Sequence, residues 1–166
     1  MPYTKLRSIA ITTMKNRFLI FICTAVLLWI TDFSAKAQSI PIDVLRSEIV
    51  SDLKNNILPF WEKHIVDPAG GFYGMVGRDG TPVMDAPKGS VLNARILWTF
   101  STAYRLYGNE AYKKLADRAQ HYFINQFIDP QYGGVYWSVK ADSTPLETDK
   151  QTCACAYAIY GLSEHF

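Results

Sequence analysis

The sequence has little excess of either charge, and this limits the partners it can bind. Its 166 residues include 17 lysines and arginines against 15 aspartates and glutamates, a net charge of +2. Nucleic-acid binding depends on a dense positive surface that neutralises phosphates. We therefore expect no nucleic-acid partner, and the length alone allows a single domain.

Cysteine is also scarce, which argues against a disulfide framework and against a zinc site. Cys23 stands in an apolar N-terminal run, whereas Cys153 and Cys155 form a C-x-C pair. A disulfide across one intervening residue is strained, and residues two apart on a helix face different directions. The sequence has neither a second cysteine pair nor a histidine at zinc-ligand spacing. We expect two small, part-buried thiols and no metal.

No apolar run is long enough to span a bilayer, and the longest is typical of an export signal. Phe18–Ile30 is a 13-residue run, short of the ~20 residues that a spanning helix needs. Lys15 and Arg17 precede it, and Ala35-Lys36-Ala37 follows as a cleavage site. We therefore predict a signal peptide over residues 1–37 and export to the periplasm or the outside of the cell.

Cleavage at this site would leave Gln38 as the first mature residue, without membrane insertion afterwards. Met14 directly precedes the basic residues, so translation from Met14 would give a more compact signal. An uncleaved N-terminal anchor is the alternative interpretation.

Apolar residues at three- and four-residue spacing predict four helices in the mature chain. Ser90 is a candidate N-cap for the second helix, and Gly108 a candidate stop at its end. Pro59 is expected to kink the last turn of the first helix. The fourth helix is apolar nearly all round, which is typical of an inner helix. The expected helices cover about residues 42–64, 90–107, 110–127 and 148–166.

Two glycine-aromatic loops repeat between these helices. Asp-Pro-x-Gly-Gly-Phe-Tyr at residues 67–73 resembles Asp-Pro-x-x-Gly-Gly-Val-Tyr at residues 129–136, with the glycine pairs 63 residues apart. Asp79-Gly80 is a good hairpin turn. Each period holds one inner and one outer helix, and such repeats stack or close into a ring. Because two periods cannot close a ring, we expect residues 38–166 to be the N-terminal part of a longer domain.

Four motifs follow one another along the mature chain. They are Gly70-Gly71-Phe72-Tyr73-Gly74, Asn93-Ala94-Arg95-Ile96-Leu97-Trp98, Tyr132-Gly133-Gly134-Val135-Tyr136-Trp137, and Lys150 followed by residues 156–164. Their order and spacing resemble the first third of cellobiose 2-epimerases, within the N-acylglucosamine 2-epimerase superfamily. The resemblance implies an all-α fold, the (α/α)6 barrel, of which this chain would supply about the first four helices.

The resemblance also implies an isomerase that works without a metal or an organic cofactor. Such an enzyme inverts C2 of the reducing-end aldose of a β-1,4-linked disaccharide. After ring opening, one histidine removes the C2 proton and a second returns a proton to the opposite face. The cis-enediolate between these steps needs cationic or hydrogen-bonding stabilisation of its oxygens.

Candidate site residues follow from the same resemblance. Arg95 matches the family's pocket arginine, and its planar fork suits the C1 and C2 oxygens. Cys153 is a candidate substrate-binding residue, because the family pattern Lys-x-x-Tyr-x-Gln-Ala has a tyrosine near the sugar at that position; Cys155 replaces the glutamine. Three aromatic residues in or beside the loops are further candidates for the cleft rim, with packing as the competing role: Tyr73, Tyr136 and Trp137.

The catalytic histidines implied by the resemblance lie beyond residue 166. The three histidines present match no catalytic position of the family, so we assign structural roles to His64, His121 and His165. This chain alone is therefore expected to be inactive.

Three alternatives stay open, each with a small-molecule sugar as partner. An aldose–ketose isomerase of the mannose type shares the enediolate but returns the proton to C1. A glycoside or unsaturated glucuronyl hydrolase on the same barrel needs paired carboxylates, and Asp149 and Glu164 stand only at helix ends. A non-catalytic carbohydrate-binding module would leave large apolar faces exposed.

Overall fold

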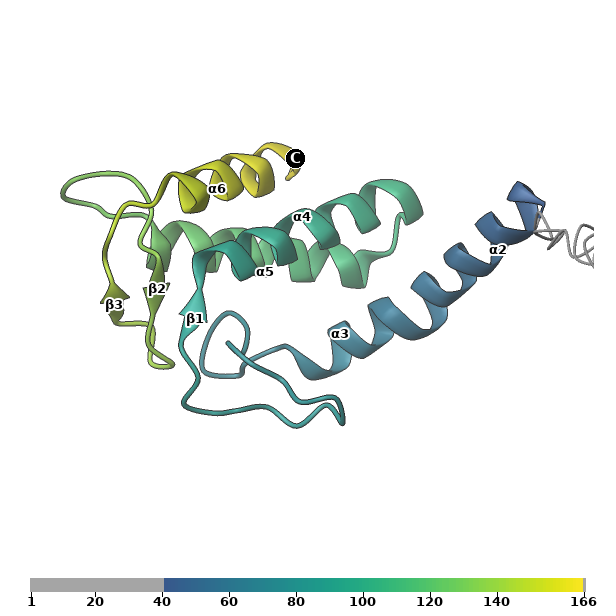
Figure 1. Cartoon of the computed structure of the whole chain (residues 1–166), viewed down its shortest axis with the longest axis horizontal. Helices are drawn as coiled ribbons and strands as arrows, with labels where there is room; N and C mark the ends of the chain where they lie inside the picture. Colours follow the sequence, from purple (N-terminus) through teal and green to yellow (C-terminus); the bar gives the residue numbers. More distant parts are fainter. Residues whose placement is uncertain (1–40, 166) are drawn as a thin grey trace, which may run out of the picture. The chain divides into compact units, whose positions relative to one another are not determined.

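The computed structural model describes residues 41–165 of the chain (Figure 1). The chain divides into two compact units, residues 1–45 and 46–166, and almost all described residues belong to the second. The predicted signal peptide and Cys23 lie outside the described residues. Within the described part, no helix is both long and apolar enough to cross a membrane.

The first predicted helix forms, but with an irregular middle. α2 (Ile42–Asp52) continues into a π-helical turn, η1 (Leu53–Ile57), and then into α3 (Leu58–His64). Pro59 stands at the start of α3 and has no N–H for the carbonyl one turn earlier, which favours a widened turn there. The predicted kink in the last turn of the first helix is therefore wrong, because the irregular turn lies before Pro59.

The next two helices have the bounds that their apolar spacing predicts, α4 (Ser90–Tyr107) and α5 (Glu110–Phe127). Gly108 between them adopts a left-handed conformation (φ 63°) and its N–H bonds back to the last turn of α4, so the predicted stop is confirmed. Asn109 then caps α5 by accepting a hydrogen bond from the Ala111 N–H at 2.9 Å. The two helices pack against each other (Figure 1).

The predicted N-cap of α4 is wrong, because Gly89 and not Ser90 holds that position. The Ser90 hydroxyl and N–H both donate to the Trp137 carbonyl, at 2.9 and 3.0 Å. Ser90 is already the first helical residue, and no side chain caps this end of the helix. Ser90 instead fixes the start of α4 to the loop after α5.

A small antiparallel sheet joins the residues just before α4 to the segment that follows α5. β1 (Lys88–Gly89), β2 (Ser138–Val139) and β3 (Pro145–Glu147) pair in that order. β1 leads directly into α4. β2 and β3 belong to the connection between α5 and the last helix, α6 (Thr152–Glu164) (Figure 1). Strands this short carry no alternation of apolar and polar residues, so the sequence does not predict them.

The last helix, α6 (Thr152–Glu164), is shorter than its prediction over residues 148–166. β3 and the segment that follows it occupy the residues before Gln151, which is the N-cap. α6 packs on α4 through the small buried residues Ala154, Ala158 and Gly161. The buried contact face of this helix therefore consists of small residues, and Cys155, Tyr157 and Leu162 pack partly against the core beside it.

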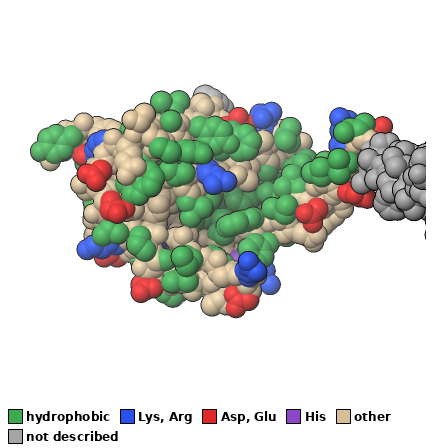
Figure 2. All heavy atoms as spheres, in the orientation of Figure 1, with side chains coloured by type: hydrophobic (Ala, Val, Ile, Leu, Met, Phe, Trp, Pro, Cys, Tyr) green, Lys and Arg blue, Asp and Glu red, His purple; other side chains and the backbone are tan. Residues whose placement is uncertain are grey.

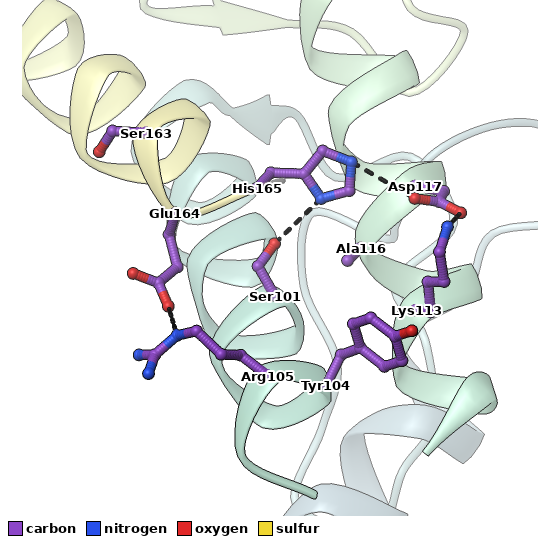
Figure 3. Close-up of a pocket in the computed structure, with 9 residues that line it drawn as sticks. All are labelled: Ser101, Tyr104, Arg105, Lys113, Ala116, Asp117, Ser163, Glu164 and His165. Carbon is purple, nitrogen blue, oxygen red and sulfur yellow. Dashed lines mark hydrogen bonds and ion pairs between the residues drawn. The ribbon is translucent and has the colours of Figure 1, made fainter. Parts of the chain in front are cut away.

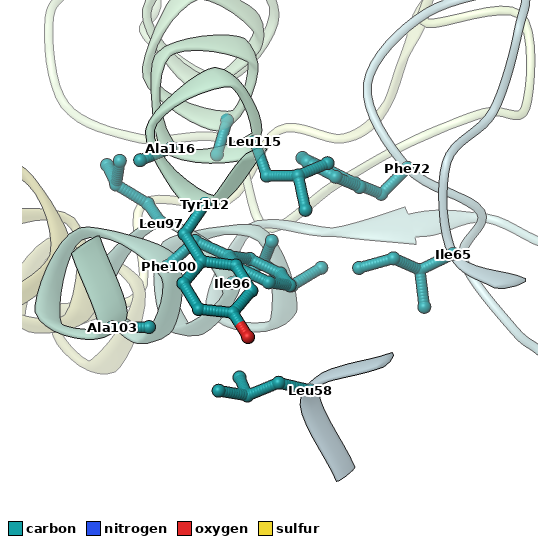
Figure 4. Close-up of a cluster of buried hydrophobic side chains, with 11 residues drawn as sticks. Leu58, Ile65, Phe72, Ile96, Leu97, Phe100, Ala103, Tyr112, Leu115 and Ala116 are labelled. Atoms are coloured by element: carbon teal, nitrogen blue, oxygen red, sulfur yellow. The ribbon is translucent and has the colours of Figure 1, made fainter. Parts of the chain in front are cut away.

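Two clusters of buried side chains form the core, and α4 and α5 supply most of their members. In contrast, Ile49 and Ile57 on the first helix are exposed. The first cluster joins α3, α4 and α5 (Figure 4) and includes Leu58, Ile65, Phe72, Ile96, Leu97, Phe100, Tyr112 and Leu115. The second joins α5, α6 and the loop between them and includes Tyr122, Phe123, Phe127, Val135, Val139, Ala154 and Ala158.

Candidate active site

The two glycine-aromatic loops share one backbone design, as the sequence repeat predicts. The Asp67 N–H bonds to the Gly71 carbonyl at 3.3 Å, and the Asp129 N–H to the Gly134 carbonyl at 3.1 Å. In both loops the aspartate Oδ1 also accepts the N–H two residues further on, at 2.9 Å. Positive φ angles at both glycine pairs allow these tight turns.

Each loop is also bound to a lysine that follows its aspartate by 21 residues. Lys88 Nζ donates to Asp67 Oδ2 at 2.6 Å, and Lys150 Nζ to Asp129 Oδ2 at 2.7 Å. Each lysine stands two residues before the first residue of α4 or α6. The ion pairs therefore tie each loop to the N-terminus of an inner helix, through charge-assisted hydrogen bonds.

The two ion pairs differ in their exposure to solvent. The Lys88 side chain is 1% exposed and also donates to the Gly70 carbonyl at 2.8 Å. The Lys150 side chain is 32% exposed, and its Nζ lies 4.0 Å from the centroid of the Tyr136 ring. The Lys88–Asp67 pair is thus buried in the interior, whereas the Lys150–Asp129 pair is partly exposed to solvent and lies beside Tyr136, a predicted site residue.

The Lys150 ion pair sets the charge states around Tyr136. The hydrogen bond from Lys150 lowers the pKa of Asp129 to about 2, with backbone N–H donors adding to the effect and burial opposing it. Burial raises the pKa of Tyr136, and the negative charge of Asp129 raises it further. At neutral pH the loop therefore presents a carboxylate, a lysine cation and a neutral phenol.

Arg95 is exposed on α4, in the first turns of the helix. It lines a pocket of about 400 Å³ between α3 and α4, whose walls include Trp61, Leu92 and Thr99. A guanidinium in such surroundings can present its planar fork to oxygen anions. Whether this pocket is the sugar pocket, and whether Arg95 has the role that the resemblance implies, stay predictions.

One side of α6 carries a stripe of residues at helical spacing, which we call the α6 stripe: Cys153, Tyr157, Tyr160 and Glu164. Tyr160 stacks on Trp98 of α4, with ring centroids 5.0 Å apart and planes at 16°. Glu164 Oε1 accepts hydrogen bonds from Thr102 at 3.0 Å and from Arg105 at 2.8 Å.

These contacts place the α6 stripe beside Arg95. On α4, Trp98 and Thr102 follow Arg95 at three- and four-residue steps, so all three lie on one side of the helix. Arg95 and Cys153, far apart in sequence, therefore belong to one surface formed by α4 and α6. Figure 2 shows hydrophobic side chains gathered over these two helices.

The other predicted site residues lie in the loops and are half-buried. The Tyr73 N–H bonds to the Ile65 carbonyl, so this tyrosine stays with the first loop. Tyr136 lies under Lys150 near the start of α6, and Trp137 is bonded to the start of α4 through Ser90. The structure thus links two of the three loop aromatics to the ends of α4 and α6, and leaves their substrate contacts as predictions.

The two cysteines of the C-x-C pair are free thiols, as expected. Cys155 is half-buried, but Cys153 is exposed, so the expected partial burial is wrong for Cys153. Its place in the first turn of α6, on the α6 stripe and away from the small-residue contact with α4, accounts for the exposure. Among residues 41–165, no group of three or more histidine, cysteine or acidic side chains could hold a metal.

Each of the three histidines contacts a polar group of the described chain. His64 Nδ1 lies 3.1 Å from the Gly80 carbonyl, in the hairpin that Asp79-Gly80 forms as predicted. His121 contacts Asn125 one turn further along α5. His165 lies between Ser101 Oγ at 3.2 Å and Asp117 Oδ1 at 3.3 Å (Figure 3).

The Ser101–His165–Asp117 chain has the residue types of a hydrolase triad but not its surroundings. Ser101 is buried in the middle of α4, where the neighbouring N–H groups belong to the helix ladder. Such a serine has no free backbone donors for an oxyanion. We therefore assign the chain a structural role, in which it joins α4 and α5 to the residue after α6.

Lys150 and Tyr160 belong to the fourth sequence motif, but sequence reasoning predicted neither the two lysine–aspartate pairs nor the stack of Tyr160 on Trp98. The pairs carried a signal, because both lysines stand at the same distance after the aspartate of the repeated loop. The stack carried none, since the position of Tyr160 opposite Trp98 depends on how α6 packs on α4.

Within residues 41–165, the helix order, the repeated loops and the short strands are those of part of an (α/α)6 barrel. The family model of N-acylglucosamine 2-epimerase (GlcNAc 2-epimerase) matches residues 71–166, and the chain belongs to this family. It is 49% identical over 123 residues to a cellobiose 2-epimerase of Bacteroides fragilis, a match that covers 74% of this chain and 31% of that relative.

Solved structures agree with this assignment. A cellobiose 2-epimerase from Spirochaeta thermophila matches with a TM-score of 0.70 and 40% identity, over 74% of this chain and 30% of that one. A D-mannose isomerase matches with a TM-score of 0.68 at 22% identity, over 76% of this chain and 32% of that one, and shows a likeness of fold alone. The chain thus spans about a third of the length of the proteins it matches.

Proposed function

We propose that the protein carrying this chain is a sugar 2-epimerase, which inverts C2 of the reducing-end aldose of a cellobiose-type, β-1,4-linked disaccharide. The observation that carries the proposal is Arg95, a guanidinium exposed beside a pocket and the α6 stripe, inside the region that matches the family. The names of the similar proteins support the sugar class.

The reaction starts from the open-chain aldehyde of the sugar. A base removes the C2 proton, the electron pair of that C–H bond forms the C1–C2 double bond, and the carbonyl electrons move onto the C1 oxygen. Arg95 would donate from its planar fork to the C1 and C2 oxygens of this cis-enediolate. Protonation of C2 on the opposite face reverses these electron shifts and yields the epimer.

The base and the acid are proposed to lie outside this chain, which alone would not turn over sugar. The contacts of the histidines support this part of the proposal, because they give each ring a structural partner. His64 contacts the Gly80 carbonyl, and His165 contacts Ser101 and Asp117. Cys153 would face the sugar and leave more room there than a tyrosine.

The test is to incubate the natural protein that carries this chain with cellobiose in deuterated water, in the presence of a metal chelator. Deuterium at C2 of both epimers, found by NMR, is the expected result. Deuterium at C1 of a ketose would instead indicate an aldose–ketose isomerase, and released monosaccharide a hydrolase. Either result, or the absence of any exchange, would overturn the proposal.

A further inference from the structure

We infer that Tyr160 is a further substrate-contacting residue, whose hydroxyl donates a hydrogen bond to a sugar oxygen beside Arg95. The inference rests on the proposed function, because it concerns the same surface of α4 and α6. It assigns Trp98 the role of a positioning residue, which holds the tyrosine ring.

Two aromatic contacts hold the Tyr160 ring in place. One face stacks on Trp98, and Tyr157 meets the ring edge-on, with centroids 5.9 Å apart and planes at 85°. Offset stacking and edge-to-face contacts are the favoured arrangements of aromatic pairs. A hydroxyl on a ring fixed in this way is preorganised, so little conformational entropy is lost when it binds an oxygen.

Packing of α6 does not require a tyrosine at this position. The contact of α6 with α4 runs through Ala154, Ala158 and Gly161, whereas Tyr160 is 39% exposed and belongs to neither buried cluster. A phenylalanine would make the same stack on Trp98 without a polar group. The stack therefore does not use the hydroxyl, and an oxygen-rich ligand on the exposed side would give it a partner.

The charges around Tyr160 suit a donor to an oxygen anion. Burial among its neighbours raises the pKa of the Tyr160 phenol, although the positive charge of Arg95 acts in the opposite direction. The phenol is therefore protonated at neutral pH and can donate. Tyr160 stacks on Trp98, which lies one helical turn after Arg95 on α4. A cation and a donor on the same surface can share the charge of an enediolate.

The experiment compares Tyr160→Phe with Tyr107→Phe in the natural protein that carries this chain. Phenylalanine keeps the stack on Trp98 and removes only the hydroxyl, and Tyr107, the last residue of α4, is the control tyrosine away from this surface. For cellobiose epimerisation we expect kcat/KM to fall about 100-fold in Tyr160→Phe. Tyr107→Phe should stay near the wild type, and both variants should keep the wild-type melting temperature. Equal activity of Tyr160→Phe and Tyr107→Phe would overturn the inference and leave the proposed function intact.

A second measurement separates this inference from the proposed function. If the wild type produces no C2 exchange, the proposed function fails, and calorimetric titration with cellobiose decides the role of Tyr160. Binding by the wild type that is weakened in Tyr160→Phe but kept in Tyr107→Phe supports the contact. Equal affinity of all three proteins, or no binding by the wild type, overturns it.

Discussion

Arg95 is one of two arginines on α4, and its surroundings differ from those of Arg105. Both are exposed, but Arg105 is paired with Glu164, whereas Arg95 lines a largely apolar pocket beside aromatic rings. An arginine that stabilises an oxygen anion needs such a setting, because water and nearby carboxylates compete for its donors.

This contrast gives a prediction at the residue scale. Arg95→Lys should lower kcat for epimerisation about 100-fold, because an ammonium cannot bind two oxygens through a planar fork. The melting temperature should not change, since Arg95 is exposed. Steady-state kinetics and thermal melts measure both quantities. Arg105→Lys is the control on the same helix and should keep its activity; an equal loss in both variants would refute a special role for Arg95.

At the scale of the elements, the two lysine–aspartate pairs test how the loops are joined to the inner helices. Lys88→Met should lower the free energy of unfolding by about 3 kcal/mol or more, because it leaves the buried Asp67 carboxylate without its cation. Lys150→Met should cost clearly less, because solvent reaches that pair. Urea denaturation of both variants gives the comparison, and equal losses would contradict the difference in burial.

The Asp129–Lys150 pair also predicts a pH dependence. The pKa of Asp129 is about 2 in the folded protein, against an ordinary value of 3.8. The contribution of the pair to stability is therefore complete above the ordinary value and is lost as the pH falls towards about 2. Asp129→Asn should melt below the wild type at neutral pH, and the gap should narrow over this acidic window. A gap that is constant with pH would show that the carboxylate charge is not involved.

Gly161 controls how closely α6 approaches α4. A β-carbon at this position would lie 2.6 Å from the Ala94 carbonyl oxygen. Gly161→Ala should therefore lower the free energy of unfolding by about 1–3 kcal/mol, even though alanine is the better helix former. Ser163→Ala, exposed on the same helix, is the control and should change stability by less than about 0.5 kcal/mol. Urea denaturation decides, and a stabilised Gly161→Ala protein would mean that the helices can separate without cost.

At the scale of the whole molecule, we propose that the protein is exported after cleavage between Ala37 and Gln38. The basic residues, the short apolar run and the A-x-A site before Gln38 support this proposal. Mass spectrometry of the protein from its native host should find a mature N-terminus at Gln38, in the periplasmic or secreted fraction. An intact N-terminus in the membrane fraction would indicate an anchor instead.

Much of the fold follows from local pattern. The bounds of α4 and α5, the stop at Gly108 and the repeated loops all depend on residues near one another in the chain. The predicted N-cap and the start of the last helix failed for the opposite reason. Ser90 is bonded to Trp137, and the residues before Gln151 are held by the sheet and by Asp129.

The sequence by itself determined the helical class, the repeat and the family, because spacing and residue type are properties of the chain; it also singled out Arg95 as a candidate site residue. Only the tertiary structure decided which residues surround Arg95. The stack of Tyr160 on Trp98, the exposure of Cys153 and the different burial of the two lysines depend on the approach of α6 to α4 and of the loops to both. Such contacts join segments far apart in sequence, and their geometry arises from close packing of side chains, which no local pattern encodes.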